Sequence, residues 1–91
     1  NRITSVWIFN GSKGRFPSGV YTERELAEEW ILRNKLTGIL TQYPINESVY
    51  DWALKNGFFA PTKENEQLPH FIGSFSSASQ EHFHYVDGIL D

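Results

Sequence analysis

The sequence predicts a small α+β domain, and three observations support this. Uncharged stretches are rich in β-branched and aromatic residues, two segments carry apolar residues at helical spacing, and turn dipeptides connect them. We expect a mainly antiparallel sheet of three to four strands, with two amphipathic helices packed on one face. With 91 residues, the chain is predicted to form a single domain over residues 1–91.

The first strand is predicted over residues 3–9, where both alternating faces are apolar and no residue is charged. The run Asn10-Gly11-Ser12-Lys13-Gly14 follows, and its Asn-Gly dipeptide predicts a turn. Residues 15–21 then predict a second strand. Pro17 has no N–H to donate, so this strand is expected either to lie at an edge of the sheet or to be interrupted at Pro17.

Two helices are predicted, each from a cap and a stripe of apolar residues. Thr22 is expected to begin the first helix, in a capping box with Glu25. Asn46 is expected to cap the second helix, and Gly57 to end it at the position after the C-cap. The predicted buried residues are Leu26, Ala27, Trp30 and Ile31 in the first helix and Val49, Trp52 and Ala53 in the second.

The remaining elements are a third strand over residues 36–43 and a last strand over residues 81–86. In the last strand, alternation points Phe83 and Tyr85 inward. Residues 60–69 have the polarity of a loop, and residues 71–75 fit either a short helix or a short strand.

Composition excludes several classes of function. The net charge is −3 and no basic block is present, so nucleic-acid binding is not expected. No apolar run reaches 18 residues, so no membrane span is expected. The absence of cysteine excludes disulfides and thiol catalysis. No signal peptide is recognised, so we expect a cytoplasmic protein, and no cofactor is expected.

His82 and His84 are the candidate metal ligands. Residues i and i+2 of a strand project from the same face, about 6.5–7 Å apart, so both imidazoles could reach one ion. The alternative is that they form the solvent-exposed face of a half-buried strand. No complete metal site is predicted, because a third ligand is not evident.

Polar residues also gather just before and within this strand. They suggest a polar surface used for recognition. The alternative is the active site of a Ser–His–Glu hydrolase, but the sequence contains no nucleophile elbow. These residues are Ser79, Gln80, Glu81, His82 and His84. No catalytic residue is assigned.

The first helix carries an acidic strip formed by Glu23, Glu28 and Glu29. Such a strip could meet a basic protein partner, and complementary charge would speed the encounter. The alternative is an ordinary solvated helix face.

The chain resembles a family of small, uncharacterised bacterial proteins. The resemblance rests on blocks that occur in this order across nearly the whole chain: GRFPSGV, AEEWI, LTGILTQYP, VYDWA and SASQEHFHY. It implies a stand-alone bacterial domain, and it transfers no catalytic or binding residue.

The function expected from these features is that of a non-enzymatic protein-interaction module, one form of which is an immunity- or antitoxin-type protein that covers a basic partner. The alternative is a small-molecule or metal-binding protein, with or without enzymatic activity, centred on residues 79–84. The chain is expected to be a monomer or a weak homodimer joined through the edge strand at residues 15–21.

Overall fold

The computed structural model describes residues 2–91, which form two compact units. Residues 2–45 and 80–91 form the first, which we call the sheet unit, and Asn46–Ser79 form the second, the helical unit. Each unit is described by itself. The prediction of one domain over residues 1–91 stays a prediction.

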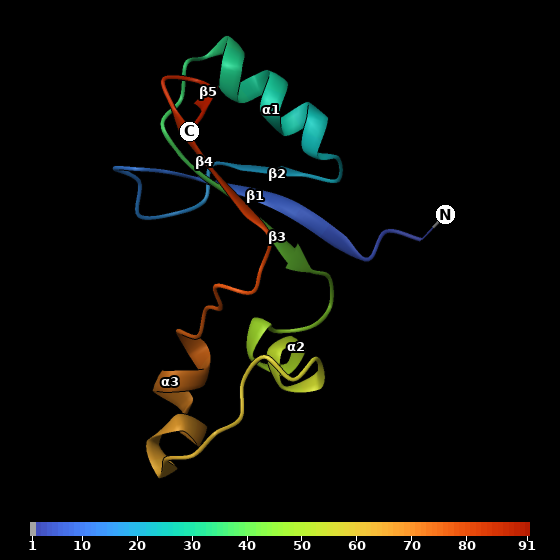
Figure 1. The fold of residues 1–91 in the computed structure, drawn as a ribbon, viewed down its shortest axis with the longest axis vertical. Helices are drawn as coiled ribbons and strands as arrows, with labels where there is room; N and C mark the ends of the chain where they lie inside the picture. Colours follow the sequence, from blue (N-terminus) through green and yellow to red (C-terminus); the bar gives the residue numbers. More distant parts are fainter. Residues whose placement is uncertain (1) are drawn as a thin grey trace. The chain divides into compact units, whose positions relative to one another are not determined.

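The sheet unit contains a five-stranded antiparallel sheet in the order β2-β1-β3-β4-β5 (Figure 1). Its strands are β1 (Ser5–Gly11), β2 (Gly19–Tyr21), β3 (Gly38–Pro44), β4 (His82–Val86) and β5 (Ile89–Leu90). The predicted α+β fold with an antiparallel sheet is confirmed, and β5 extends the sheet by one short strand. As predicted, β2 lies at an edge, but it covers only Gly19–Tyr21, so the predicted start at residue 15 is wrong; Pro17 has no N–H to donate to the ladder.

Strand register separates the sheet into two faces. On the helix face, Phe9 pairs with Leu40, which in turn pairs with Phe83. Helix α1 (Arg24–Arg33) supplies Ala27 and Ile31, both 0% exposed, to the core on this face. The full core cluster is Trp7, Phe9, Ala27, Ile31, Leu40 and Tyr85, with Tyr21, Trp30, Leu36 and Phe83 packed around it.

The start of α1 differs from the prediction. The helix begins at Arg24 and its N-cap is Glu23, with no side-chain capping bond, so the predicted capping box of Thr22 and Glu25 is wrong. Thr22 lies one residue too early to cap this helix. Leu26 is 50% exposed, because it lies about 100° around the helix from Ala27, on the side away from Ile31.

The turn after β1 also differs from the prediction. Strand β1 continues through Asn10 and Gly11, and the chain reverses after them, where the Gly14 N–H donates to the Gly11 carbonyl at 2.9 Å. At the same end of the sheet, Asp87 and Gly88 have φ values of +51° and +87° and join β4 to β5 in a tight hairpin. Residues with positive φ at both central positions favour such a hairpin.

The helical unit contains α2 (Val49–Lys55), the 3₁₀ helix η1 (Glu64–Gln67) and α3 (Pro69–Gly73). Ser48 caps α2 by accepting the Asp51 N–H at 3.0 Å, so the predicted cap at Asn46 is wrong. Asn46 lies two residues too early and has a φ of +58°. Gly57, with a φ of +75°, follows the C-cap as predicted.

Aromatic rings form the core of the helical unit. Tyr50 and Ala53 are buried, and Tyr50 packs edge-on against Phe75 at a centroid distance of 5.4 Å. Phe59 and Phe71 complete this cluster. The Tyr50 hydroxyl donates to the Glu66 carbonyl at 3.0 Å, so the buried phenol ties α2 to η1. Of the three residues of α2 that were predicted to be buried, Ala53 is buried, whereas Val49 and Trp52 are only half-buried.

None of the helices within residues 2–91 combines the length and the apolar character needed to cross a lipid bilayer.

Candidate functional site

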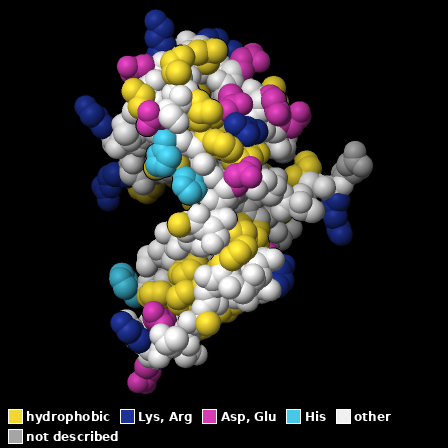
Figure 2. All heavy atoms as spheres, in the orientation of Figure 1, with side chains coloured by type: hydrophobic (Ala, Val, Ile, Leu, Met, Phe, Trp, Pro, Cys, Tyr) yellow, Lys and Arg dark blue, Asp and Glu magenta, His cyan; other side chains and the backbone are white. Residues whose placement is uncertain are grey.

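The strands contribute no charged residue to the face of the sheet opposite α1, which we call the open face; Asp91, which follows β5, borders this face beside His84. Its apolar members include Val20, Ile39, Val86 and Ile89, whose side chains are 63%, 38%, 48% and 60% exposed. The open face as a whole consists of Val6, Ile8, Asn10, Val20, Ile39, Thr41, Tyr43, His82, His84, Val86 and Ile89. On the side of the molecule drawn in Figure 2, charged side chains are interspersed with apolar ones.

His82 and His84 lie on the open face, as the alternation along β4 predicts. Both are exposed, and their ring centroids are 5.5 Å apart at an interplanar angle of 78°. They stand opposite Thr41 and Ile39 of the neighbouring strand. No group of three or more potential metal ligands from His, Cys, Asp or Glu occurs within residues 2–91.

The residues just before β4 have structural roles. Gln80 is only 4% exposed, and its side-chain amide donates to the Gln42 carbonyl at 3.1 Å. The Glu81 carbonyl accepts the Gln42 N–H at 2.9 Å, while the residue itself is exposed. Ser79 belongs to the helical unit, where its N–H donates to the Ser77 hydroxyl at 3.2 Å.

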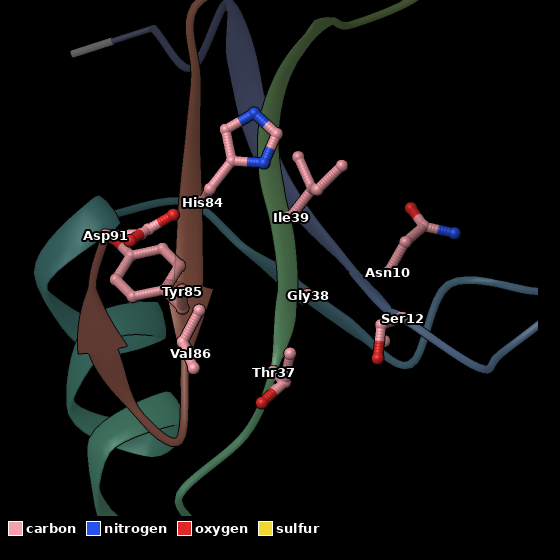
Figure 3. Close-up of a pocket in the computed structure, with 10 residues that line it drawn as sticks. Asn10, Ser12, Thr37, Gly38, Ile39, His84, Tyr85, Val86 and Asp91 are labelled. Carbon is pink, nitrogen blue, oxygen red and sulfur yellow. The ribbon is translucent and has the colours of Figure 1, made fainter.

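A shallow cavity of about 430 Å³ lies where β1, β3 and β4 meet the loops at one end of the sheet (Figure 3). Asn10, Ile39 and His84 reach it from three adjacent strands. Its lining residues are Asn10, Gly11, Ser12, Thr37, Gly38, Ile39, His84, Tyr85, Val86 and Asp91. The lining offers an amide, hydroxyls, an imidazole and a carboxylate beside an apolar floor, a combination typical of small-ligand sites.

Hydrogen bonds hold the rim of this cavity. The Ser12 N–H donates to the Thr37 carbonyl at 3.0 Å, and the Thr37 hydroxyl accepts the Asp87 N–H at 2.9 Å. The Asp91 N–H donates to the His84 carbonyl at 2.8 Å. The backbone near His84 is therefore fixed on both sides, by β3 and by the segment after β5.

Glu28 of the predicted acidic strip forms hydrogen bonds with two other side chains of the sheet unit. Its Oε2 accepts the Tyr85 hydroxyl at 2.5 Å and the Arg24 Nε–H at 3.2 Å. The Arg24 guanidinium also lies over the Phe83 ring, 3.7 Å from its centroid. This network ties α1 to β4 on the helix face.

The other two members of the strip are exposed. Glu29 lies 3.9 Å from the Arg33 guanidinium in an i,i+4 pair, and Glu23 is the N-cap residue of α1. Exposed pairs of this kind contribute little to stability. Since Arg24 and Arg33 lie along the same helix, the strip carries less net negative charge than the glutamates alone indicate.

The predicted surface residues therefore divide between the two sides of the sheet unit. His82 and His84 share the open face, whereas the glutamates lie on α1, which covers the helix face. Sequence reasoning missed Arg24 and Tyr85 as partners of Glu28. Tyr85 was predicted to point inward, and a buried phenol requires a hydrogen-bond partner, but that signal does not identify which residue it is.

We expect the Tyr85→Phe substitution to lower the free energy of unfolding by about 1.5–3 kcal/mol at pH 7, because it removes a hydrogen bond to a charged group. Burial, followed by the hydrogen bond to Glu28 and the charge of that carboxylate, raises the pKa of Tyr85 to about 12. The unfolded chain, with a tyrosine pKa near 10, therefore ionises first. The free energy of unfolding should fall as pH rises from 10 toward 12.

Urea denaturation at pH 7 and at several pH values between 9 and 12 measures both effects. The loss at alkaline pH should be smaller in Tyr85→Phe than in the wild type. Tyr43→Phe, which removes a phenol hydroxyl from the open face, controls for the loss of a hydroxyl as such. Equal alkaline losses in wild type and Tyr85→Phe would contradict the role of the Tyr85–Glu28 bond.

Comparison with known proteins identifies one relationship. A family model described as a domain of unknown function matches residues 6–91. No curated protein and no solved structure matches the chain.

Proposed function

The chain belongs to the DUF7710 family, and we propose that it is a non-enzymatic protein-interaction module that binds its partner through the open face of the sheet. A surface of large exposed apolar side chains on a regular scaffold is typical of protein-binding sites. The observation that carries the proposal is that four apolar side chains on this face are 38–63% exposed, while its strands contribute no charged residue and its one carboxylate, Asp91, lies at the border beyond β5.

The chemistry of this face limits the partner. A charged group of the partner buried against Ile8 or Val20, away from Asp91, would lose water without gaining a counter-ion, which is unfavourable. The matching surface is therefore apolar and uncharged at its centre. Hydrogen bonds to Asn10, Thr41 and the two histidines would orient it.

The acidic strip on α1 is the weaker alternative for the binding surface. Glu28 already has two internal partners, and Glu29 lies near Arg33, so only part of the negative charge is directed outward. The proposal keeps the biological setting that the sequence suggests, a small bacterial cytoplasmic protein of the immunity or antitoxin type. It moves the contact surface from the helix to the sheet.

We expect charged substitutions on the open face to abolish partner binding. The partner is first captured with the tagged wild-type protein from its native lysate and identified by mass spectrometry, and its recovery is then measured with variants. Val20→Glu and Ile89→Glu should each reduce recovery about tenfold or more, because each places an unpaired charge in an apolar contact.

Leu32→Glu is the matched control. Leu32 is 55% exposed, close to the 60% of Ile89, but it belongs to α1 rather than to the sheet. This variant should recover the partner as the wild type does. Loss of the partner in Leu32→Glu but not in Ile89→Glu would place the contact on the helix, and failure to recover any stoichiometric partner would overturn the proposal.

A further inference from the structure

The orientation of His82 and His84 on the open face suggests a second property, which does not depend on the protein-binding role. Both imidazoles are exposed, they project from the same strand face, and their centroids are 5.5 Å apart. At this separation, small rotations of the two side chains bring one nitrogen of each ring within about 2.0–2.1 Å of a shared metal ion.

One of the two rings is already oriented by the backbone. The His82 Nδ1 lies 2.7 Å from the Gln80 carbonyl oxygen. A carbonyl only accepts hydrogen bonds, so Nδ1 carries the proton and the lone pair is on Nε2, which faces away from this bond. Metal-binding histidines in proteins commonly have this second bond, from the other ring nitrogen to a backbone carbonyl.

The supporting carbonyl is itself held in place. Gln80 is buried, its amide bonds to the Gln42 carbonyl, and the next peptide joins the β3 ladder through the Glu81 carbonyl. His84 is held by strand pairing with Ile39 and by the Asp91 N–H on its own carbonyl. Neither histidine backbone has to move for the two rings to approach one ion.

We propose that His82 and His84 form a two-histidine site for one divalent transition-metal ion, with water at the remaining coordination positions. Two neutral imidazoles suit Cu²⁺, Ni²⁺ and Zn²⁺, whereas Mg²⁺ and Ca²⁺ require oxygen ligands. Affinity follows the usual order for nitrogen ligands, so Cu²⁺ binds more tightly than Ni²⁺ or Zn²⁺. No other His, Cys, Asp or Glu within residues 2–91 joins the pair in a larger cluster, so the site binds and releases metal readily.

The test titrates the protein, without a polyhistidine tag, with Cu²⁺ or Zn²⁺ alone. Isothermal titration calorimetry gives stoichiometry and affinity, and NMR follows the histidine ring signals. We expect one ion per chain, shifts of the His82 and His84 ring signals with Zn²⁺, and no effect of Mg²⁺. His82→Gln and His84→Gln should each weaken Cu²⁺ binding at least about tenfold, within the range found when the surroundings of a metal site are disrupted.

His70→Gln is the control, because His70 is exposed and is the one remaining histidine of the chain. This variant should bind metal as the wild type does. All three histidines are exposed, so the variants should fold, and circular dichroism checks this. Metal binding that survives the His82→Gln/His84→Gln double substitution would overturn the proposal, and so would the absence of ring-signal shifts at millimolar Zn²⁺.

Discussion

Replacing Gly38 with alanine is expected to lower the free energy of unfolding by about 3 kcal/mol or more, the upper part of the range for overpacked cores. Gly38 is buried in β3, the central strand of the sheet. A Cβ at this position would lie 2.2 Å from the Asn10 carbonyl oxygen, 2.7 Å from the Phe9 ring and 2.9 Å from the Gly11 Cα. Two of these neighbours are backbone atoms of β1.

Because β3 is paired on both sides, neither strand can move apart without breaking ladder hydrogen bonds. Chemical denaturation followed by tryptophan fluorescence measures the loss, since Trp7 and Trp30 report on the sheet unit. Gly73→Ala is the control, because a Cβ there would meet no atom within 4 Å. If Gly38→Ala proved as stable as Gly73→Ala, the close approach of β1 and β3 at this point would be incorrect.

Truncation of Phe9 to alanine is expected to cost about 3–5 kcal/mol, as for other large aromatic residues in protein cores. Phe9 is 1% exposed and is among the largest fully buried side chains within residues 2–91. Its ring also meets Trp30 edge-on, with centroids 5.5 Å apart and an interplanar angle of 88°. The substitution therefore removes both buried apolar area and an aromatic pair between β1 and α1.

Phe16→Ala serves as the matched control for Phe9→Ala. Phe16 lies in the loop before β2, is 73% exposed and stacks only loosely on the Arg15 guanidinium, 5.7 Å from the ring centroid. Its loss should change stability by less than about 1 kcal/mol. Thermal unfolding of both variants gives the comparison, and a similar loss in both would show that Phe9 is not at the centre of the core.

Much of this fold could be predicted from periodicity along single elements. Alternation in β4 correctly placed Phe83 and Tyr85 inward and the two histidines outward, because a strand side chain's face depends only on its position. The spacing of Ala27 and Ile31 identified the buried side of α1. Positive φ at Gly57 was predictable from the helix end that precedes it.

Two of the wrong predictions concern the first residue of a helix, where several neighbouring residues can act as the N-cap. Thr22 and Asn46 are both good capping residues, yet the helices begin after Glu23 and Ser48, one and two residues further along the chain. The hydrogen-bond partner of the Tyr85 hydroxyl could not be predicted from the sequence either. Glu28 lies 57 residues away in the chain, and only the packing of α1 on the sheet brings them together.

The position of the helical unit in the chain has a consequence of its own. It is inserted between β3 and β4, which are neighbours in the sheet and are already joined where the Gln42 N–H donates to the Glu81 carbonyl. The entropy lost on closing a loop grows only with the logarithm of its length, about 0.6 kcal/mol for each doubling. The free energy of pairing β3 with β4 therefore depends only weakly on the length of the segment that connects them. The connection between β3 and β4 is therefore expected to tolerate changes in length while the sheet keeps its register.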